Sequence, residues 1–110
     1  MTTDGRQHAK QHTRVLVHYR TSDDDPQAVE RTYHEISKRM AGTAGLLRNE
    51  LLTNALDAGS VVVMSEWESL EAFNAWREGP DHGVTEPLRT YQDRERGPKV
   101  FEVYQVAAAY

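Results

Sequence analysis

Three aromatic side chains gather in the segment VVVMSEWESLEAFNAW, which spans residues 61–76. Trp67 ends a predicted strand, and Phe73 and Trp76 recur on one side of the helix expected after it. Aromatic walls can hold a flat organic substrate while a base and a cation act on it. The same residues can equally form plain core or dimer packing, and both interpretations stay open at this point.

The bases and cations for such a site come from the histidines and arginines of the chain. Imidazole changes its charge near neutral pH, so an internal histidine is the natural base. A guanidinium can stabilise a developing oxyanion. The candidate bases are His18, His34 and His82, and the candidate cations are Arg20, Arg48 and Arg89. His18 is expected either at an interface or as the base, whereas His34 and His82 are expected to face solvent.

Composition removes several other classes of function. The chain has 110 residues, no cysteine and a formal net charge of -4, with the basic residues scattered. Thiolate metal sites, disulfides and nucleic-acid binding are therefore not expected. No HxH or HExxH pair and no glycine-rich phosphate loop occurs, so we expect no metal and no cofactor. No apolar run is long enough to span a bilayer, and we expect a cytoplasmic protein that does not bind membranes.

The elements that must position these residues follow from hydrophobic periodicity. Residues 1–12 are polar and aperiodic and are predicted to be a mobile tail, and residues 13–110 a single domain. Asp25 and Ser69 are predicted to cap the two main helices, the first of which has Pro26 as its opening residue and ends near residue 41. The predicted strands span residues 13–20, 46–54, 60–67 and 99–107, and a further helical stretch spans residues 84–94.

The order strand, helix, strand, strand, helix, strand predicts a ferredoxin-like α+β protomer with an antiparallel sheet. Helices can cover only one face of that sheet, yet its strands carry apolar residues on both faces. A second copy of the chain would supply the missing layer, so we expect a homodimer. The residues expected near its interface are Leu16, Val62, Met64 and Tyr104.

The covered face is expected to enclose a largely apolar pocket. Its walls are predicted to consist of the residues of the third strand that point toward the helices and of the apolar residues along one side of each helix. These substrate-binding residues are Tyr33, Val63, Phe73, Trp76, Leu88 and Tyr91, with Trp67 beside them.

The stretch SEWESLEAFNAW followed by GPDH, with a hairpin opened by Gly45 and a closing FEVYQV, resembles the antibiotic biosynthesis monooxygenase family of dimeric α+β barrels. The resemblance covers about residues 13–107. It implies a dimer formed through the sheets and a pocket between sheet and helices. In its anthrone-oxidising members, the tryptophan that matches Trp67 lines the pocket and a helical arginine near Arg89 joins it. Those enzymes carry asparagine where this chain has Val63 and tyrosine where it has Phe73.

The haem-degrading branch of the same superfamily offers a second comparison. There, the tryptophan that matches Trp76 contacts the porphyrin, and an iron-ligating histidine stands where this chain has Glu86. Without that histidine, the resemblance does not favour haem degradation.

The resemblance implies a cofactor-independent monooxygenase that acts on a small aromatic, polyketide-type substrate, an anthrone or phenol that becomes a quinone. Trp67, Arg89 and His18 are the predicted catalytic residues. The family does not fix the reaction. A non-redox cyclase, dehydratase or isomerase on the same scaffold is the alternative, as is a member that binds a small molecule without turnover.

Overall fold

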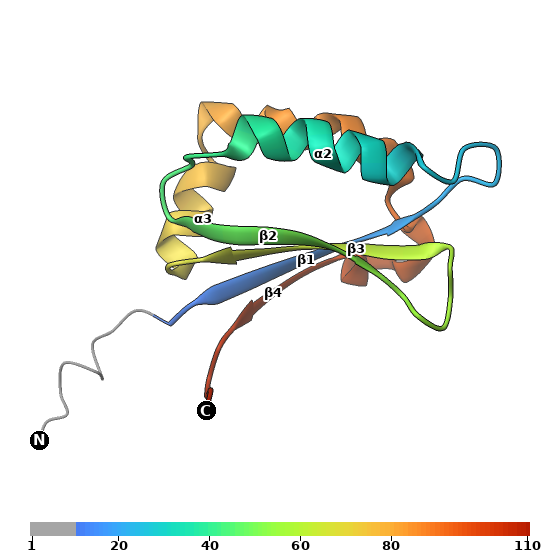
Figure 1. The fold of residues 1–110 in the computed structure, drawn as a ribbon. Helices are drawn as coiled ribbons and strands as arrows, with labels where there is room; N and C mark the ends of the chain where they lie inside the picture. Colours follow the sequence, from blue (N-terminus) through green and yellow to red (C-terminus); the bar gives the residue numbers. More distant parts are fainter. Residues whose placement is uncertain (1–10) are drawn as a thin grey trace, which may run out of the picture.

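The computed structural model describes residues 11–110, and the larger part of the predicted N-terminal tail, residues 1–10, lies outside them. The chain forms a four-stranded antiparallel sheet in the order β2-β3-β1-β4, with its two α-helices on one face (Figure 1). This arrangement confirms the predicted ferredoxin-like α+β fold. In chain order the elements are β1 (Thr13–Arg20), α2 (Ala28–Met40), β2 (Leu46–Thr53), β3 (Ser60–Trp67), α3 (Leu70–Arg77), the 3-10 helical segments η1 (Pro80–Tyr91) and η2 (Arg94–Val100), and β4 (Phe101–Gln105).

One of the two predicted helix caps is correct. Ser69 accepts a hydrogen bond from the backbone N–H of Ala72 at 3.1 Å, so it caps α3. The prediction for Asp25 is wrong, because α2 begins only at Ala28. The Asp25 carboxylate instead accepts a bond from the Arg31 guanidinium at 2.6 Å, while its carbonyl accepts from the Ala28 N–H. The Asp25 carboxylate is thus bound to a side chain of α2 by an ion pair.

The segment after α3 also differs from its prediction. In place of one helix over residues 84–94, the chain forms the two 3-10 segments, with Pro87 inside the first. A proline has no N–H to donate and disrupts a regular α-helix, which explains the tighter turns. Gly97, at φ 58°, and Pro98 then delay the last strand, which is shorter than the predicted 99–107.

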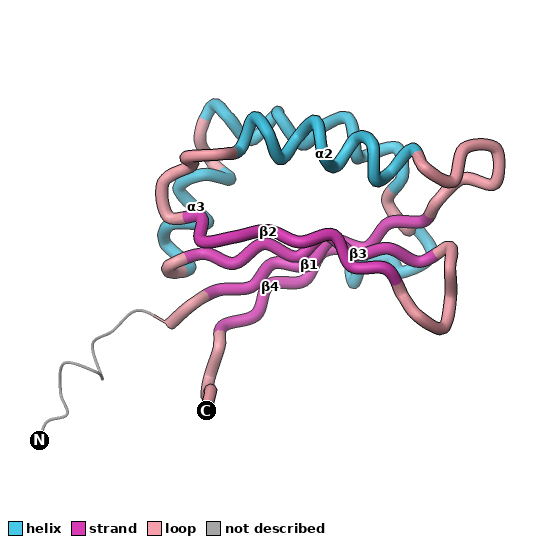
Figure 2. The backbone as a smooth tube through the Cα atoms, in the orientation of Figure 1, coloured by secondary structure: helices cyan, strands magenta, loops and turns pink. Residues whose placement is uncertain are grey.

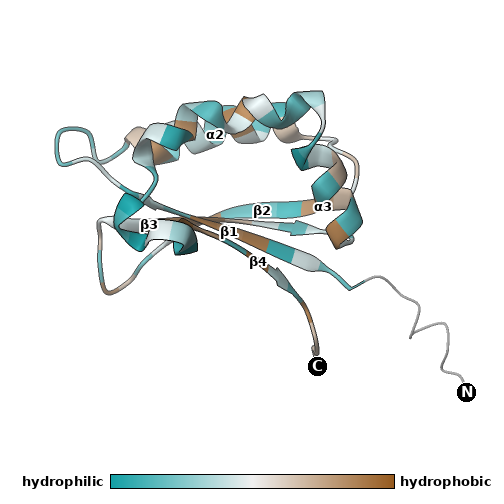
Figure 3. Ribbon diagram, turned by 180° about the vertical axis from the view of Figure 1, so that it is seen from behind, coloured by the Kyte–Doolittle hydropathy of each residue, from teal (hydrophilic) through white to brown (hydrophobic). Residues whose placement is uncertain are grey.

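The core forms between the sheet and the helices, as the alternation of side chains along the strands predicts. Val15 and Tyr19 of β1 are buried against the helices, and Leu16 and His18 point to the other face. Along α2, apolar and polar residues alternate at helical spacing (Figure 3). Each fully buried aliphatic side chain contributes about 1.5–3 kcal/mol. The buried core comprises Val15, Tyr19, Val29, Ile36, Met40, Val61, Trp67, Phe73 and Leu88.

The opposite face of the sheet, which we call the open face, carries no helix over its middle in residues 11–110 (Figure 2). The strand register places Leu16 beside Met64 there, and Tyr104 and Val62 lie on the same face. Charged pairs border these apolar residues. Glu66, whose side chain is 7% exposed, accepts bonds from His12 and Arg48 at 3.0 and 2.9 Å. Burial by itself raises the pKa of Glu66, but these bonds outweigh it and keep the pKa below its usual value.

The turn between α2 and β2 depends on a close backbone approach at Gly45. Both Gly42 and Gly45 have positive φ, at 84° and 81°. A Cβ at Gly45 would lie 2.5 Å from the Cβ of Ala72 on α3, whereas a Cβ at Gly42 would have nothing within 4 Å. The Gly45 carbonyl also accepts the Glu68 N–H at 2.8 Å, which joins this turn to the start of α3.

We therefore predict that Gly45→Ala lowers the free energy of unfolding by more than Gly42→Ala does. Both variants incur the backbone strain of an alanine at positive φ, about 1 kcal/mol or more, and Gly45→Ala adds a steric clash with Ala72. Urea unfolding followed by circular dichroism measures both. Equal losses in the two variants would show that the contact with α3 contributes nothing.

Candidate functional site

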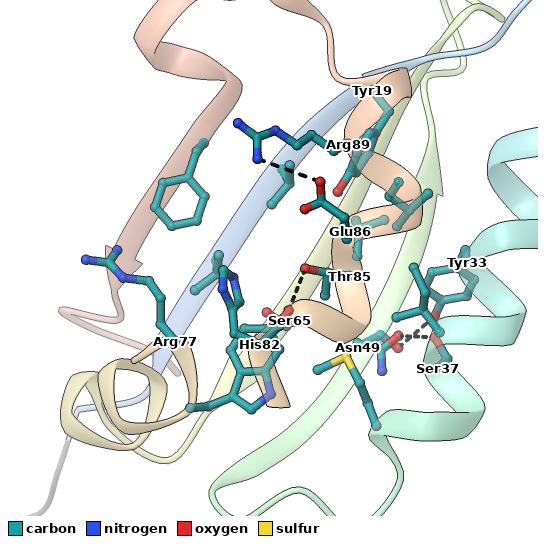
Figure 4. Close-up of a pocket in the computed structure, with 18 of the residues that line it drawn as sticks. Tyr19, Tyr33, Ser37, Asn49, Ser65, Arg77, His82, Thr85, Glu86 and Arg89 are labelled. Carbon is teal, nitrogen blue, oxygen red and sulfur yellow. Dashed lines mark hydrogen bonds and ion pairs between the residues drawn. The ribbon is translucent and has the colours of Figure 1, made fainter. Parts of the chain in front are cut away.

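A cavity of about 520 Å³ lies between the sheet and the helices (Figure 4). Strand side chains form its floor, α2 and α3 supply two walls, and η1 together with Gln92 and Val100 supplies the rest. Most of the predicted site residues line it. They are Tyr33, Val63, Trp67, Phe73, Trp76, Leu88 and Arg89.

Three aromatic rings pack together on one side of the cavity. The ring centroid of Trp67 lies 5.6 Å from that of Phe73 and 5.3 Å from that of Trp76. Trp67 is 0% exposed, and its Nε1 donates to the Ser65 hydroxyl at 2.9 Å. Trp67 is therefore a core residue that also stands among the residues around the cavity, and its contact with a substrate stays a prediction.

Two predicted site residues do not line the cavity. Tyr91 packs against the edge of the core instead. His18 lies on the open face, where its Nε2 is 2.6 Å from Glu102 Oε1, and this hydrogen bond lowers the pKa of Glu102. Because consecutive strand residues point to opposite faces, His18 cannot reach the cavity that Val17 lines. The assignment of His18 as base in this cavity is therefore corrected.

Of the three candidate bases, His82 is the one that lines the cavity. It is solvent-exposed, as expected, but its ring also lies edge-on to Trp76, with centroids 4.8 Å apart. The Thr85 hydroxyl donates to the His82 carbonyl at 3.1 Å and holds the start of η1. His34 lies on the exposed side of α2, 3.6 Å from Glu30. The structure thus brings a titratable imidazole against the aromatic wall.

The cavity holds a neutral polar end that sequence reasoning missed. Asn49 on β2 lies beside Ser65 on β3 in the strand register, and both line the cavity. Ser37 donates its hydroxyl proton to Asn49 Oδ1 at 3.2 Å, which leaves the Asn49 NH₂ group as the donor for a ligand. The Tyr33 hydroxyl donates to the Asn49 backbone carbonyl at 3.3 Å. Ser65 lies two residues after Val63 on β3, so both side chains point to the same face. The alternation of side chains along the strand was therefore enough to predict that Ser65 lines the cavity.

Two guanidinium groups lie at the cavity and differ in their surroundings. Arg89 Nη1 is 3.8 Å from Glu86 Oε1, and both side chains are largely exposed. Arg77 lies over two rings instead, with its Cζ 5.6 Å from the Phe73 centroid and 5.9 Å from that of Phe101. Arg77 follows Phe73 by four residues on α3, and residues at this spacing lie on the same side of a helix. The contact between them could therefore have been predicted from the sequence.

Burial moves the pKa of one further cavity residue further from neutrality. Desolvation raises the pKa of Tyr19 to about 12, so its phenol keeps its proton near neutral pH and can donate a hydrogen bond but cannot act as a base.

Across the described part of the chain, no three histidine, aspartate or glutamate side chains converge as a metal site would require.

None of the helices within residues 11–110 is both long and apolar enough to cross a membrane.

Comparisons with known proteins agree with this architecture. SnoaB, a cofactor-independent oxygenase from Streptomyces nogalater, shares 17% identity at a TM-score of 0.67, over 91% of this chain and 95% of that chain. A conserved protein from Methanosarcina mazei Go1 shares 10% identity at a TM-score of 0.69, over 92% of this chain and 96% of that chain. At such identities the likeness shows the fold alone.

None of the curated proteins matches the chain. The model of the family described as antibiotic biosynthesis monooxygenase matches residues 13–86, a span that includes both tryptophans and His82. This match covers well over half of the sequence and agrees with the fold and with the resemblance carried by residues 65–76. The chain therefore belongs to the antibiotic biosynthesis monooxygenase family.

Proposed function

We propose that this protein is a cofactor-independent monooxygenase that converts an aromatic, polyketide-type anthrone or phenol to a quinone. The observation that carries the proposal is one cavity in which an imidazole, a guanidinium and neutral hydrogen-bonding groups meet a wall of three aromatic rings. A volume of about 520 Å³ lies within the range of small-molecule sites. Family membership supports the same assignment.

The substrate of such a reaction is its own electron source. His82 takes a proton from the acidic methylene group of an anthrone, and the anion passes one electron to dioxygen. The radical pair combines to form a carbon–oxygen bond, and the resulting peroxide takes up a proton. Removal of the second methylene hydrogen with cleavage of the O–O bond leaves the quinone carbonyl and releases water. One oxygen atom of each dioxygen enters the product, so no external reductant is needed.

Each cavity group has a role in this scheme. Trp67, Phe73 and Trp76 hold the ring system and exclude water from it. Arg89 stabilises the enolate oxygen that appears when the proton leaves. Asn49 supplies an amide donor from β2, a neighbouring strand to the one that carries Val63. The anthrone-oxidising members have an asparagine at the position of Val63. In this chain Asn49, on the neighbouring strand, would supply the amide group instead.

A non-redox cyclase, dehydratase or isomerase is the second candidate. The observation in its favour is that Val63 and Phe73 give the cavity apolar groups where anthrone oxidation is associated with polar ones. His82 would then move a proton and Arg89 would hold a carbonyl oxygen, with no part for dioxygen. A member that binds its ligand without turnover would have the same cavity.

Oxygen uptake separates these functions. With a panel of anthrones and naphthols, we expect one dioxygen consumed for each quinone formed from an anthrone, and isotope-labelled dioxygen should leave one labelled atom in that quinone. Product that forms at an undiminished rate under strict anaerobiosis would instead establish the non-redox reaction. If a ligand binds but no product forms with or without oxygen, the protein is a family member that binds a small molecule without catalysing a reaction.

His82→Gln should lower kcat by at least about tenfold, because a positioned general base contributes about 10²–10⁴-fold. His34→Gln is the matched control, since it makes the same change on the exposed side of α2 and should leave kcat at the wild-type value. Steady-state kinetics on the two variants, with folding checked by circular dichroism, measure the difference. Equal kcat values in the two variants would remove His82 from the mechanism.

We also propose that the chain acts as a homodimer joined through the open face. Leu16, Val62, Met64 and Tyr104 share that face, and Leu52, at 42% exposure, extends it. Burial of this apolar surface against a second copy would remove it from water. Light scattering at micromolar concentration should give twice the chain mass, and a stable folded monomer there would contradict the proposal.

A further inference from the structure

Among residues 11–110, Arg77 is the guanidinium of the cavity that has no ion-pair partner. Arg89, the other guanidinium there, has Glu86 within ion-pair distance. The Arg77 guanidinium lies over the Phe73 and Phe101 rings, and all three residues line the cavity. Ring faces position a guanidinium but leave its N–H edge open, and that edge matches a carboxylate with two parallel hydrogen bonds.

The neutral donors lie at the other side of the cavity. Asn49 is on β2 and Phe101 on β4, the two edge strands, with β3 and β1 between them. Three strand spacings of about 4.8 Å separate these edges by about 14 Å. The floor between them is formed by Val15, Val17, Val63 and Ser65. Within the described part of the chain, the lining therefore runs from an amide donor, across an apolar floor, to a guanidinium without an ion-pair partner, and its length suits a compound with several rings.

We propose that Arg77 is a specificity-determining residue that binds a carboxylate of the substrate, which is then a multi-ring aromatic carboxylic acid with a neutral carbonyl or hydroxyl oxygen directed to Asn49. The inference rests on the proposed function only in taking this cavity as the substrate site. Arg89 has Glu86 3.8 Å away and is already assigned to the enolate oxygen, so the carboxylate of the substrate is assigned to the other guanidinium. The carboxylate therefore binds on the Arg77 side, and the reacting ring lies against the aromatic wall beside His82.

A binding experiment that needs no turnover tests this inference. The probes are anthracene-2-carboxylate and its methyl ester, which share the ring system and differ in charge, and binding is followed by calorimetry or by quenching of tryptophan fluorescence. Wild-type protein should bind the acid about tenfold or more tightly than the ester, as expected for a charge-assisted hydrogen bond. Arg77→Gln should remove that preference by weakening acid binding alone, and Arg77→Lys should restore part of it.

Two matched variants locate the effect. Arg94→Gln makes the same change at an exposed arginine that does not line the cavity, and it should keep the full preference for the acid. Arg89→Gln should also keep the preference. The inference fails if wild-type protein binds acid and ester equally, if Arg77→Gln keeps the preference, or if Arg89→Gln removes it. Oxygen uptake on an anthrone without acid preference would overturn this inference alone, whereas acid preference without oxygen uptake would overturn only the monooxygenase.

Discussion

The pairing of β1 with β3 is the constraint on which the rest of the structure depends. These central strands pair along the full eight residues of each, with Val15 opposite Ser65 and Val17 opposite Val63. A slip of one residue would turn every side chain to the other face and exchange the cavity floor for the surface that carries Glu66. One register therefore gives the sheet an apolar face that can hold an aromatic ring and an opposite face on which carboxylates meet histidine and arginine.

Periodicity was sufficient for most of the fold. The alternation in β1 and β3, the stripe on α2 and the turn between β2 and β3 each depend on neighbouring residues, which a sequence displays directly. The errors arose where a distant or competing partner decides the local geometry. Asp25 forms an ion pair with Arg31 where a helix cap was expected, and Pro87 lies inside the 3-10 turns that replace the expected helix. Neither feature is visible in a local hydrophobic pattern.

The candidate site was predictable in its aromatic wall and less so in its polar groups. Trp67 and Phe73 follow from parity and helical spacing, because a side chain's direction is fixed by its own element. Asn49 enters the cavity through its register with Ser65, and His82 through its contact with Trp76, which are tertiary relations. The prediction for His18 failed in the opposite way. Its residue type suited catalysis, but its position on β1 points its side chain to the open face, where it contacts Glu102. Chemistry-bearing residue types are thus less informative than the face to which an element assigns them.

The uneven construction of the cavity has an evolutionary consequence. Its floor belongs to paired strands, whereas His82, Thr85, Glu86 and Arg89 all come from η1, a 3-10 segment in which only Leu88 is buried. A 3-10 segment has weaker hydrogen-bond geometry than a sheet, and its exposed side chains can be exchanged at little cost to the core. Descendants of one ancestral protein could therefore acquire different acids, bases and ligand preferences by substitutions in this short stretch, while the sheet that orients the substrate's rings is inherited unchanged.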